Sequence, residues 1–149
     1  MLIGAGFIWS GASQLADPAL LYGGLLHALE QYGAPFPFYR SFLSRFVELH
    51  QELFASAVAI GELLIGAGFL TGTLVSLSAL GGAFLVLNFG FATSYGDLPR
   101  LLLHFASALA FLLFGHLCAG LTWGLDGWLI RHIHEAVVLF PLRRSLPRS

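Results

Sequence analysis

The chain has 149 residues, of which 57% are hydrophobic and only 10% charged, whereas a soluble domain usually carries about 25% charged residues. Together with a mean hydropathy of +0.81, this composition favours a lipid-embedded protein and excludes a soluble enzyme. The formal net charge of −1 excludes a basic nucleic-acid-binding face, and the single cysteine, Cys118, excludes an internal disulfide.

The first predicted element is an apolar helix over residues 1–15, about 22 Å long at 1.5 Å per residue. We interpret it as a tilted first transmembrane helix in a locally thin bilayer, unless the true start lies upstream of Met1. A signal peptide is the rival interpretation, but no positively charged segment precedes the apolar stretch. Asp17-Pro18 is typical of a helix start, and it predicts a short interfacial helix over residues 18–31.

A long apolar stretch begins at Leu53 and contains one formal charge, Glu62, before Thr93. The stretch is about twice as long as a single span, so it is expected to fold back once. The turn is predicted at residues 70–73, where Gly72 can adopt positive φ and the threonine hydroxyls can cap helix ends. This predicts spans over residues 49–70 and 73–91. Before them, the aromatic residues Phe36, Phe38 and Tyr39 are expected at headgroup depth.

The last span is predicted over residues 99–122, with Pro99 in its first turn and Arg100 reaching the interface. Asp126 is expected to cap a second interfacial helix over residues 127–140, which Pro141 stops. The sequence therefore predicts an all-α fold: one domain, residues 1–149, formed by a four-helix transmembrane bundle with interfacial amphipathic helices.

The arginines predict the orientation of this bundle. With four spans both termini lie on one side, which holds Arg131, Arg143, Arg144 and Arg148. The opposite side holds fewer arginines and most of the carboxylates. Because cytoplasmic loops carry the excess of positive charge, both termini are expected to be cytoplasmic.

Three stretches resemble the DoxX/DoxD-like family of small four-helix membrane proteins. They are the glycine-rich residues 4–18, ending in Asp17-Pro18, the glutamate-bearing residues 61–72, and residues 119–126, ending in Gly124-Leu125-Asp126. Gln14 and Leu121 stand where the family often has lysine and arginine. The resemblance implies a small membrane partner of redox proteins, such as the small subunit of a thiosulfate:quinone oxidoreductase, in a bacterial cytoplasmic membrane.

Glu62 is the most informative single residue, because it lies near the middle of its predicted span. An intramembrane carboxylate is costly unless it is protonated, paired or in contact with water. Gln14, Asn88 and His104 are predicted in the outer half of the other three helices, where they can converge with Glu62 on a pocket and hydrogen-bond a quinone carbonyl. The alternative is that all four form interhelical hydrogen bonds without any ligand.

The histidines and the cysteine give weaker indications of a chemical role. His104 and His116 are twelve residues apart and point in different directions, so haem ligation is disfavoured, although one histidine can bind a chlorophyll magnesium. His132 and His134 are two residues apart and diverge on a helix, which favours a titrating interfacial patch over a metal site. Cys118 lies in an apolar segment and is expected to be inert.

The sequence therefore favours an accessory or anchoring integral-membrane subunit of a larger redox complex, without catalytic activity of its own. One alternative is a quinone-interacting small subunit of a membrane oxidoreductase, with Glu62 exchanging protons. Another is a pigment- or lipid-binding subunit of a photosynthetic or respiratory complex, with chlorophyll or carotenoid at a subunit interface. The expected partners are other redox subunits and the lipid bilayer, with no nucleic acid, no metal and no intrinsic cofactor.

Overall fold

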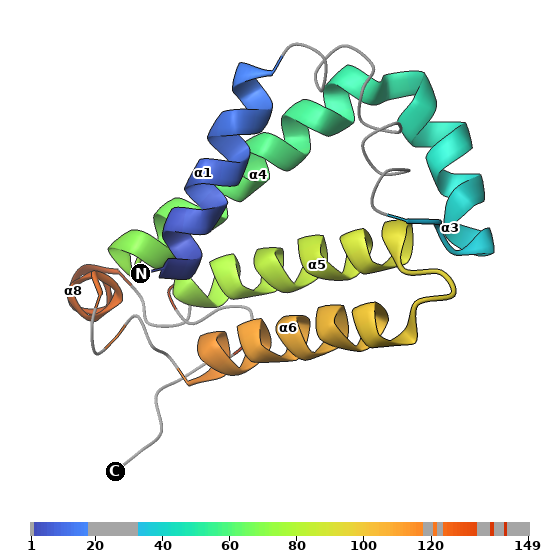
Figure 1. Ribbon diagram of the computed structural model, residues 1–149. Coiled ribbons are helices and arrows are strands. Elements are labelled where there is room, and N and C mark those ends of the chain that lie inside the picture. Colours follow the sequence, from blue (N-terminus) through green and yellow to red (C-terminus); the bar gives the residue numbers. More distant parts are fainter. Residues whose placement is uncertain are drawn as a thin grey trace.

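The computed structural model describes residues 2–17, 33–117, 121, 124–133, 138 and 142, and these residues form helices and turns without strands. Figure 1 shows the order of the elements along the chain. They are α1 (Leu2–Ala16), α3 (Pro37–Phe42), the π-helical turn η2 (Leu43–Val47), the 3-10 turn η3 (Glu48–His50), α4 (Gln51–Thr71), α5 (Val75–Thr93), α6 (Leu98–His116) and α8 (Asp126–His132). The all-α prediction is confirmed.

In the described part of the chain, three helices are long and apolar enough to cross a membrane. They are the helical segment over Pro37–Thr71, which comprises α3, η2, η3 and α4, and the helices α5 and α6. The predicted spans 49–70 and 73–91 agree with α4 and α5 within two residues. The predicted span 99–122 is too long at its end, because α6 stops at His116. These helices indicate a membrane protein.

The helices form two antiparallel pairs, α1 with α4 and α5 with α6 (Figure 1). The pairs meet at the turn between α4 and α5 and diverge towards α3 at the other end. The backbones of α1 and α4 approach each other closely because small residues on the two helices face each other. A Cβ added to Gly4 would lie 2.8 Å from the Gly66 carbonyl oxygen, and one added to Gly11 would lie 2.6 Å from that of Ala59. Such contacts between backbones are typical of helices packed in lipid.

Phe111 of α6 lies where the two pairs meet. Its ring centroid is 5.7 Å from that of Phe7 on α1 and 5.7 Å from that of Phe69 on α4. On its third side it packs against Ala83 and the backbone of Gly82 on α5. One buried ring therefore contacts all of the other three long helices.

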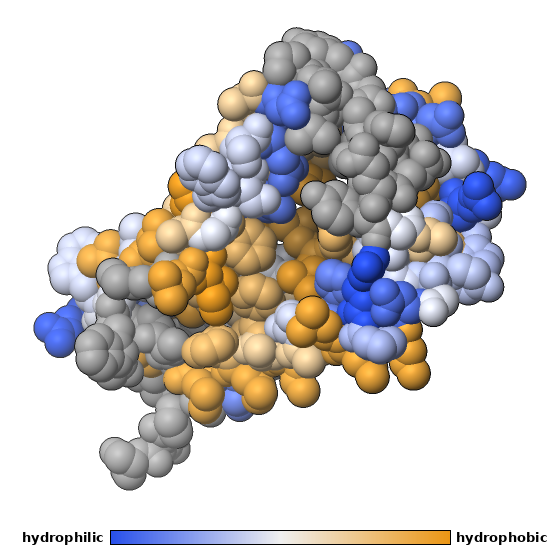
Figure 2. All heavy atoms as spheres, viewed as in Figure 1, coloured by the Kyte–Doolittle hydropathy of each residue, from blue (hydrophilic) through white to orange (hydrophobic). Residues whose placement is uncertain are grey.

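Large apolar side chains cover the outside of the structure, whereas its buried positions are mostly small. Figure 2 shows hydrophobic side chains along α5 and α6 and hydrophilic ones at the two ends, around α3 and α8. On α6, side chains that are about half exposed or more include those of Leu102, Leu103, Leu109, Leu113 and Phe114. A surface of this kind fits hydrocarbon rather than water.

The turn between α4 and α5 is closed by the start of α8. Gly72 has φ of +66°, as predicted. The Asp126 carboxylate accepts hydrogen bonds from the backbone N–H groups of Leu74, at 2.6 Å, and Val75, at 3.1 Å. The Asp126 N–H donates in return to the Gly72 carbonyl oxygen, at 2.9 Å. We call this set of contacts the Asp126 clasp.

Two expectations about this region were wrong. Asp126 caps the distant helix α5 rather than its own helix, because the first N–H groups of α5 are otherwise unsatisfied. At the end of α4 the Thr71 hydroxyl donates to the Ala67 carbonyl oxygen, at 2.8 Å. The predicted helix over 127–140 is interrupted, because α8 ends at His132 and Ile133 is extended.

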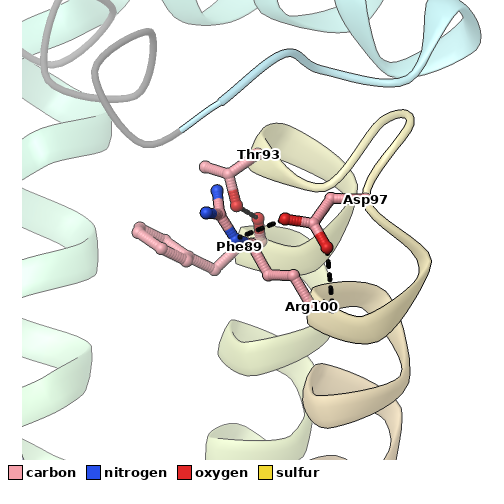
Figure 3. A network of polar contacts seen from close by, with 4 residues as sticks. All are labelled: Phe89, Thr93, Asp97 and Arg100. Atoms are coloured by element: carbon pink, nitrogen blue, oxygen red, sulfur yellow. Dashed lines mark hydrogen bonds and ion pairs between the residues drawn. The ribbon is translucent and has the colours of Figure 1, made fainter.

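The predicted interfacial helix over residues 18–31 lies outside the described residues, as does most of 134–140. At the start of α6, Pro99 occupies the first turn as predicted. The Arg100 guanidinium pairs with Asp97 at 3.3 Å, and the same carboxylate accepts from the Arg100 N–H at 3.0 Å (Figure 3). That Arg100 reaches the interface stays a prediction.

Candidate functional site

Gln14 and Glu62 form a hydrogen-bonded pair between α1 and α4. The Gln14 Nε2 amide donates to Glu62 Oε2 at 2.8 Å and to the Ser10 hydroxyl at 3.1 Å. Ser10 and Gln14 share a face of α1 because they are four residues apart. The pair lies beside the Gly11–Ala59 contact, where the two helices are closest. Glu62 is twelfth of the 21 residues of α4, so its carboxyl lies near the middle of this span.

Asn88 joins α5 to α3. Its Oδ1 accepts a hydrogen bond from the Tyr39 hydroxyl at 2.7 Å, and its Nδ2 donates to the Phe84 carbonyl oxygen at 2.7 Å. Both ends of the Asn88 amide are therefore satisfied within the protein.

His104 lies between α5 and α6. A Cβ added to Gly90 would lie 2.9 Å from the Cβ of His104, so the missing side chain of Gly90 makes room for the histidine. The imidazole ring centroid is 5.9 Å from the ring of Phe89. His104 thus packs against α5 through its ring.

The structure pairs two of the four predicted site residues, Gln14 and Glu62, and gives each of the other two a partner on α3 or α5. The prediction brought all four side chains together, and the structure shows direct contact between Gln14 and Glu62. Helix rotation, which depth does not reveal, directs Asn88 to Tyr39 instead. A common ligand for all four residues stays a prediction.

Sequence reasoning missed a cluster of aromatic rings between α3 and the end of α5. The Phe36 ring centroid lies 5.4 Å from that of Tyr95 and 6.0 Å from that of Phe91, and Phe38 lies 5.6 Å from Phe91. The Phe36 N–H also donates to the Phe91 carbonyl oxygen at 3.0 Å. The density of aromatic residues from 36 to 46 was the available signal. These contacts hold α3 against α5.

In the part of the chain that the structure describes, no three His, Cys, Asp or Glu residues are placed to hold a metal ion. His132 stacks on Trp128, with ring centroids 4.2 Å apart, and its Nδ1 lies 3.0 Å from the Trp128 carbonyl oxygen. His134, the second histidine of the predicted interfacial patch, lies outside the described residues, as does Cys118.

Comparisons with family models, with curated proteins and with solved structures found no match for this chain. The resemblance to the DoxX/DoxD-like family therefore rests on the three stretches of sequence. Each stretch contains a residue that joins two parts of the structure: Gly11, Glu62 and Asp126.

Proposed function

We propose that this protein is a four-span integral membrane protein that serves as an accessory or anchoring subunit of a larger redox complex. One observation carries the proposal. The amide and carboxyl side chains within the apolar helices join helices to one another, Gln14 to Glu62 and Asn88 to Tyr39, while large apolar side chains point outward. A protein built in this way offers its outer faces, rather than an interior site, for interactions.

The fourth span is α1. At 15 residues it is about 22 Å long, so it needs tilt or local thinning of the bilayer to cross. Its exposed residues are apolar apart from Ser13, with Leu2 90% and Trp9 79% exposed, and the Ser13 hydroxyl donates to the Trp9 carbonyl oxygen of its own helix. Its polar Gln14 is hydrogen-bonded to Glu62. Both features favour a helix that lies beside α4 in lipid, where an unpaired polar group is unfavourable.

The redox role comes from the resemblance to the DoxX/DoxD-like family, as do the bacterial cytoplasmic membrane and the redox partners. The cytoplasmic location of both termini comes from the arginine distribution. Gentle detergent extraction of the tagged chain from its native membrane tests this role, followed by native electrophoresis, mass spectrometry and an absorption spectrum. We expect migration with redox subunits and their cofactor absorbance. Migration as a lone, colourless chain would contradict the proposal, and chlorophyll or carotenoid bands would favour the pigment-binding alternative.

The quinone-interacting alternative depends on Glu62, and the Glu62→Gln variant separates it from an accessory role. The amide oxygen still accepts from Gln14, so we expect the variant to assemble with its partners and to leave electron transfer to quinone unchanged. The measurement is quinone reduction by isolated membranes, with the assembled complex quantified on a native gel. Glu52→Gln, an exposed carboxylate on the same helix, is the matched control. If the Glu62→Gln complex assembles but loses quinone reduction, while the Glu52→Gln complex keeps it, the quinone-interacting alternative replaces the accessory role.

A further inference from the structure

The helix that contains α4 is too long for one membrane crossing. The helical segment over Pro37–Thr71 has 35 residues, about 52 Å at 1.5 Å per residue, and it contains one residue with non-helical backbone angles, His50, with φ of −134° and ψ of 41°. The hydrocarbon core is about 30 Å thick and is filled by roughly 20 residues, the length of α4 alone. Figure 1 shows the chain turning away from the axis of α4 where η2 and η3 lie. A π-helical turn is a common cause of such a bend. Residues 37–50 are therefore more than one membrane crossing needs.

One side of this segment packs on the protein. Leu43 and Val47, four residues apart, are only 8% and 4% exposed. Tyr39, one turn earlier, donates its hydroxyl hydrogen bond to Asn88 of α5. This side holds the segment in place.

A second side is apolar and exposed. Phe38, Phe42, Phe46 and Leu49 follow one another at spacings of four, four and three residues, which places them on one side of a helix. The rings of Phe42 and Phe46 stack at 5.8 Å, so these two share that side. The exposed fractions are 63% for Phe38, 56% for Phe46 and 73% for Leu49. Leu53, at the start of α4 and 67% exposed, continues the stripe into the span.

The remaining side is polar and exposed: it carries Arg40, Ser41, Ser44, Arg45 and Glu48. Among the described residues the only ion pair is Arg100–Asp97, so neither Arg40 nor Arg45 is neutralised by a described carboxylate. The segment thus presents three different sides: one for the protein, one for an apolar medium and one for water.

We infer that residues 37–50 form an interfacial helix in the headgroup layer of a phospholipid bilayer. The stripe of Phe38, Phe42, Phe46 and Leu49 inserts at the boundary of the acyl chains, and Arg40 and Arg45 contact lipid phosphates. Lipid fits this side better than a protein partner because the stripe continues into a span, and because aromatic and arginine side chains are typical of headgroup depth. The inference rests on the membrane arrangement proposed above, and not on the redox role.

Nitroxide labels on the full chain, reconstituted in phosphatidylcholine vesicles, test this placement. On a Cys118→Ala background, single cysteines replace Phe46 on the apolar side, Ser44 on the polar side or Leu64 in the middle of α4. Collision rates are measured with oxygen, which concentrates in lipid, and with a water-soluble nickel chelate. We expect the oxygen-to-nickel ratio to be several-fold higher at position 46 than at position 44, and highest at position 64.

Each other outcome overturns the inference in a distinguishable way. Equal ratios at positions 44 and 46, with a lipid-exposed label at 64, mean that the segment lies in water while the membrane arrangement stands. A label at 46 that neither reagent reaches means that a protein surface covers the stripe. A water-exposed label at 64 means that the membrane arrangement itself fails, and the interfacial helix with it.

Discussion

Asp126→Ala is expected to lower the free energy of unfolding by about 2–4 kcal/mol. The substitution leaves the N–H groups of Leu74 and Val75 without an acceptor at a buried helix start, and each unsatisfied buried donor costs about 1–3 kcal/mol. Leu74 has φ of +49°, an unfavourable conformation for leucine that the clasp supports. Titration with sodium dodecyl sulfate, followed by circular dichroism of the protein in mild detergent, measures the change.

Asp97→Ala is the matched control, because Asp97 caps α6 with one hydrogen bond at an exposed position. Its loss is expected to cost about 1 kcal/mol, the usual value for a helix cap. Equal effects of the two substitutions would show that the Asp126 clasp contributes no more than an ordinary surface cap.

The pH dependence of stability provides a second measurement on the clasp. Burial raises the pKa of the Asp126 carboxyl above its usual value of 3.8, because desolvation outweighs the two backbone hydrogen bonds that favour ionisation. The folded state then holds this proton more tightly than the unfolded state, so the contribution to stability is full below pH 3.8 and is lost as the pH rises through the folded-state pKa. Asp126→Asn does not titrate. The stability of the wild type relative to Asp126→Asn is expected to fall across that interval, and a constant difference would contradict the shift.

Phe111→Ala is expected to lower the free energy of unfolding by about 2–3 kcal/mol. This is below the usual range of about 3–5 kcal/mol for buried aromatic residues in soluble proteins, because in lipid the transfer term is small and the loss comes mainly from the cavity. The cavity forms where α6 meets Phe7, Phe69 and Ala83, so contacts among all four long helices weaken together. The same detergent titration measures it.

Phe114→Ala on the same helix is the control, since the Phe114 side chain is 45% exposed on the outer face. We expect a change within about 0.5 kcal/mol, as for a surface position. If Phe114→Ala lowers the free energy of unfolding as much as Phe111→Ala, the contacts of Phe111 contribute no more to stability than those of a side chain on the outer face of α6.

Local signals predicted most of the helix boundaries. Gly72 marks the turn between α4 and α5 because its positive φ favours glycine, and Pro99 marks the start of α6 because the first turn needs no N–H from it. The helical start at Pro37 was missed. The prolines at 35 and 37 indicate a break, but the second of them lies in the first turn of α3.

The candidate site was predicted in part. Depth along a helix follows from the sequence, and it named Gln14 and Glu62 among four side chains expected to converge; the structure pairs these two. Asn88 was expected in the same group but bonds to Tyr39, because the rotation of α5 about its axis decides which neighbour its amide meets.

The sequence by itself determined that this is an all-helical, membrane-type protein, because hydropathy and helix length are sums over neighbouring residues. Only the tertiary structure decided that Gly11 faces Ala59, that Phe111 lies at the meeting point of the helices and that Asp126 caps α5. These contacts join residues 28 to 104 positions apart. They depend on how whole helices rotate and pack, which no local pattern of residues specifies.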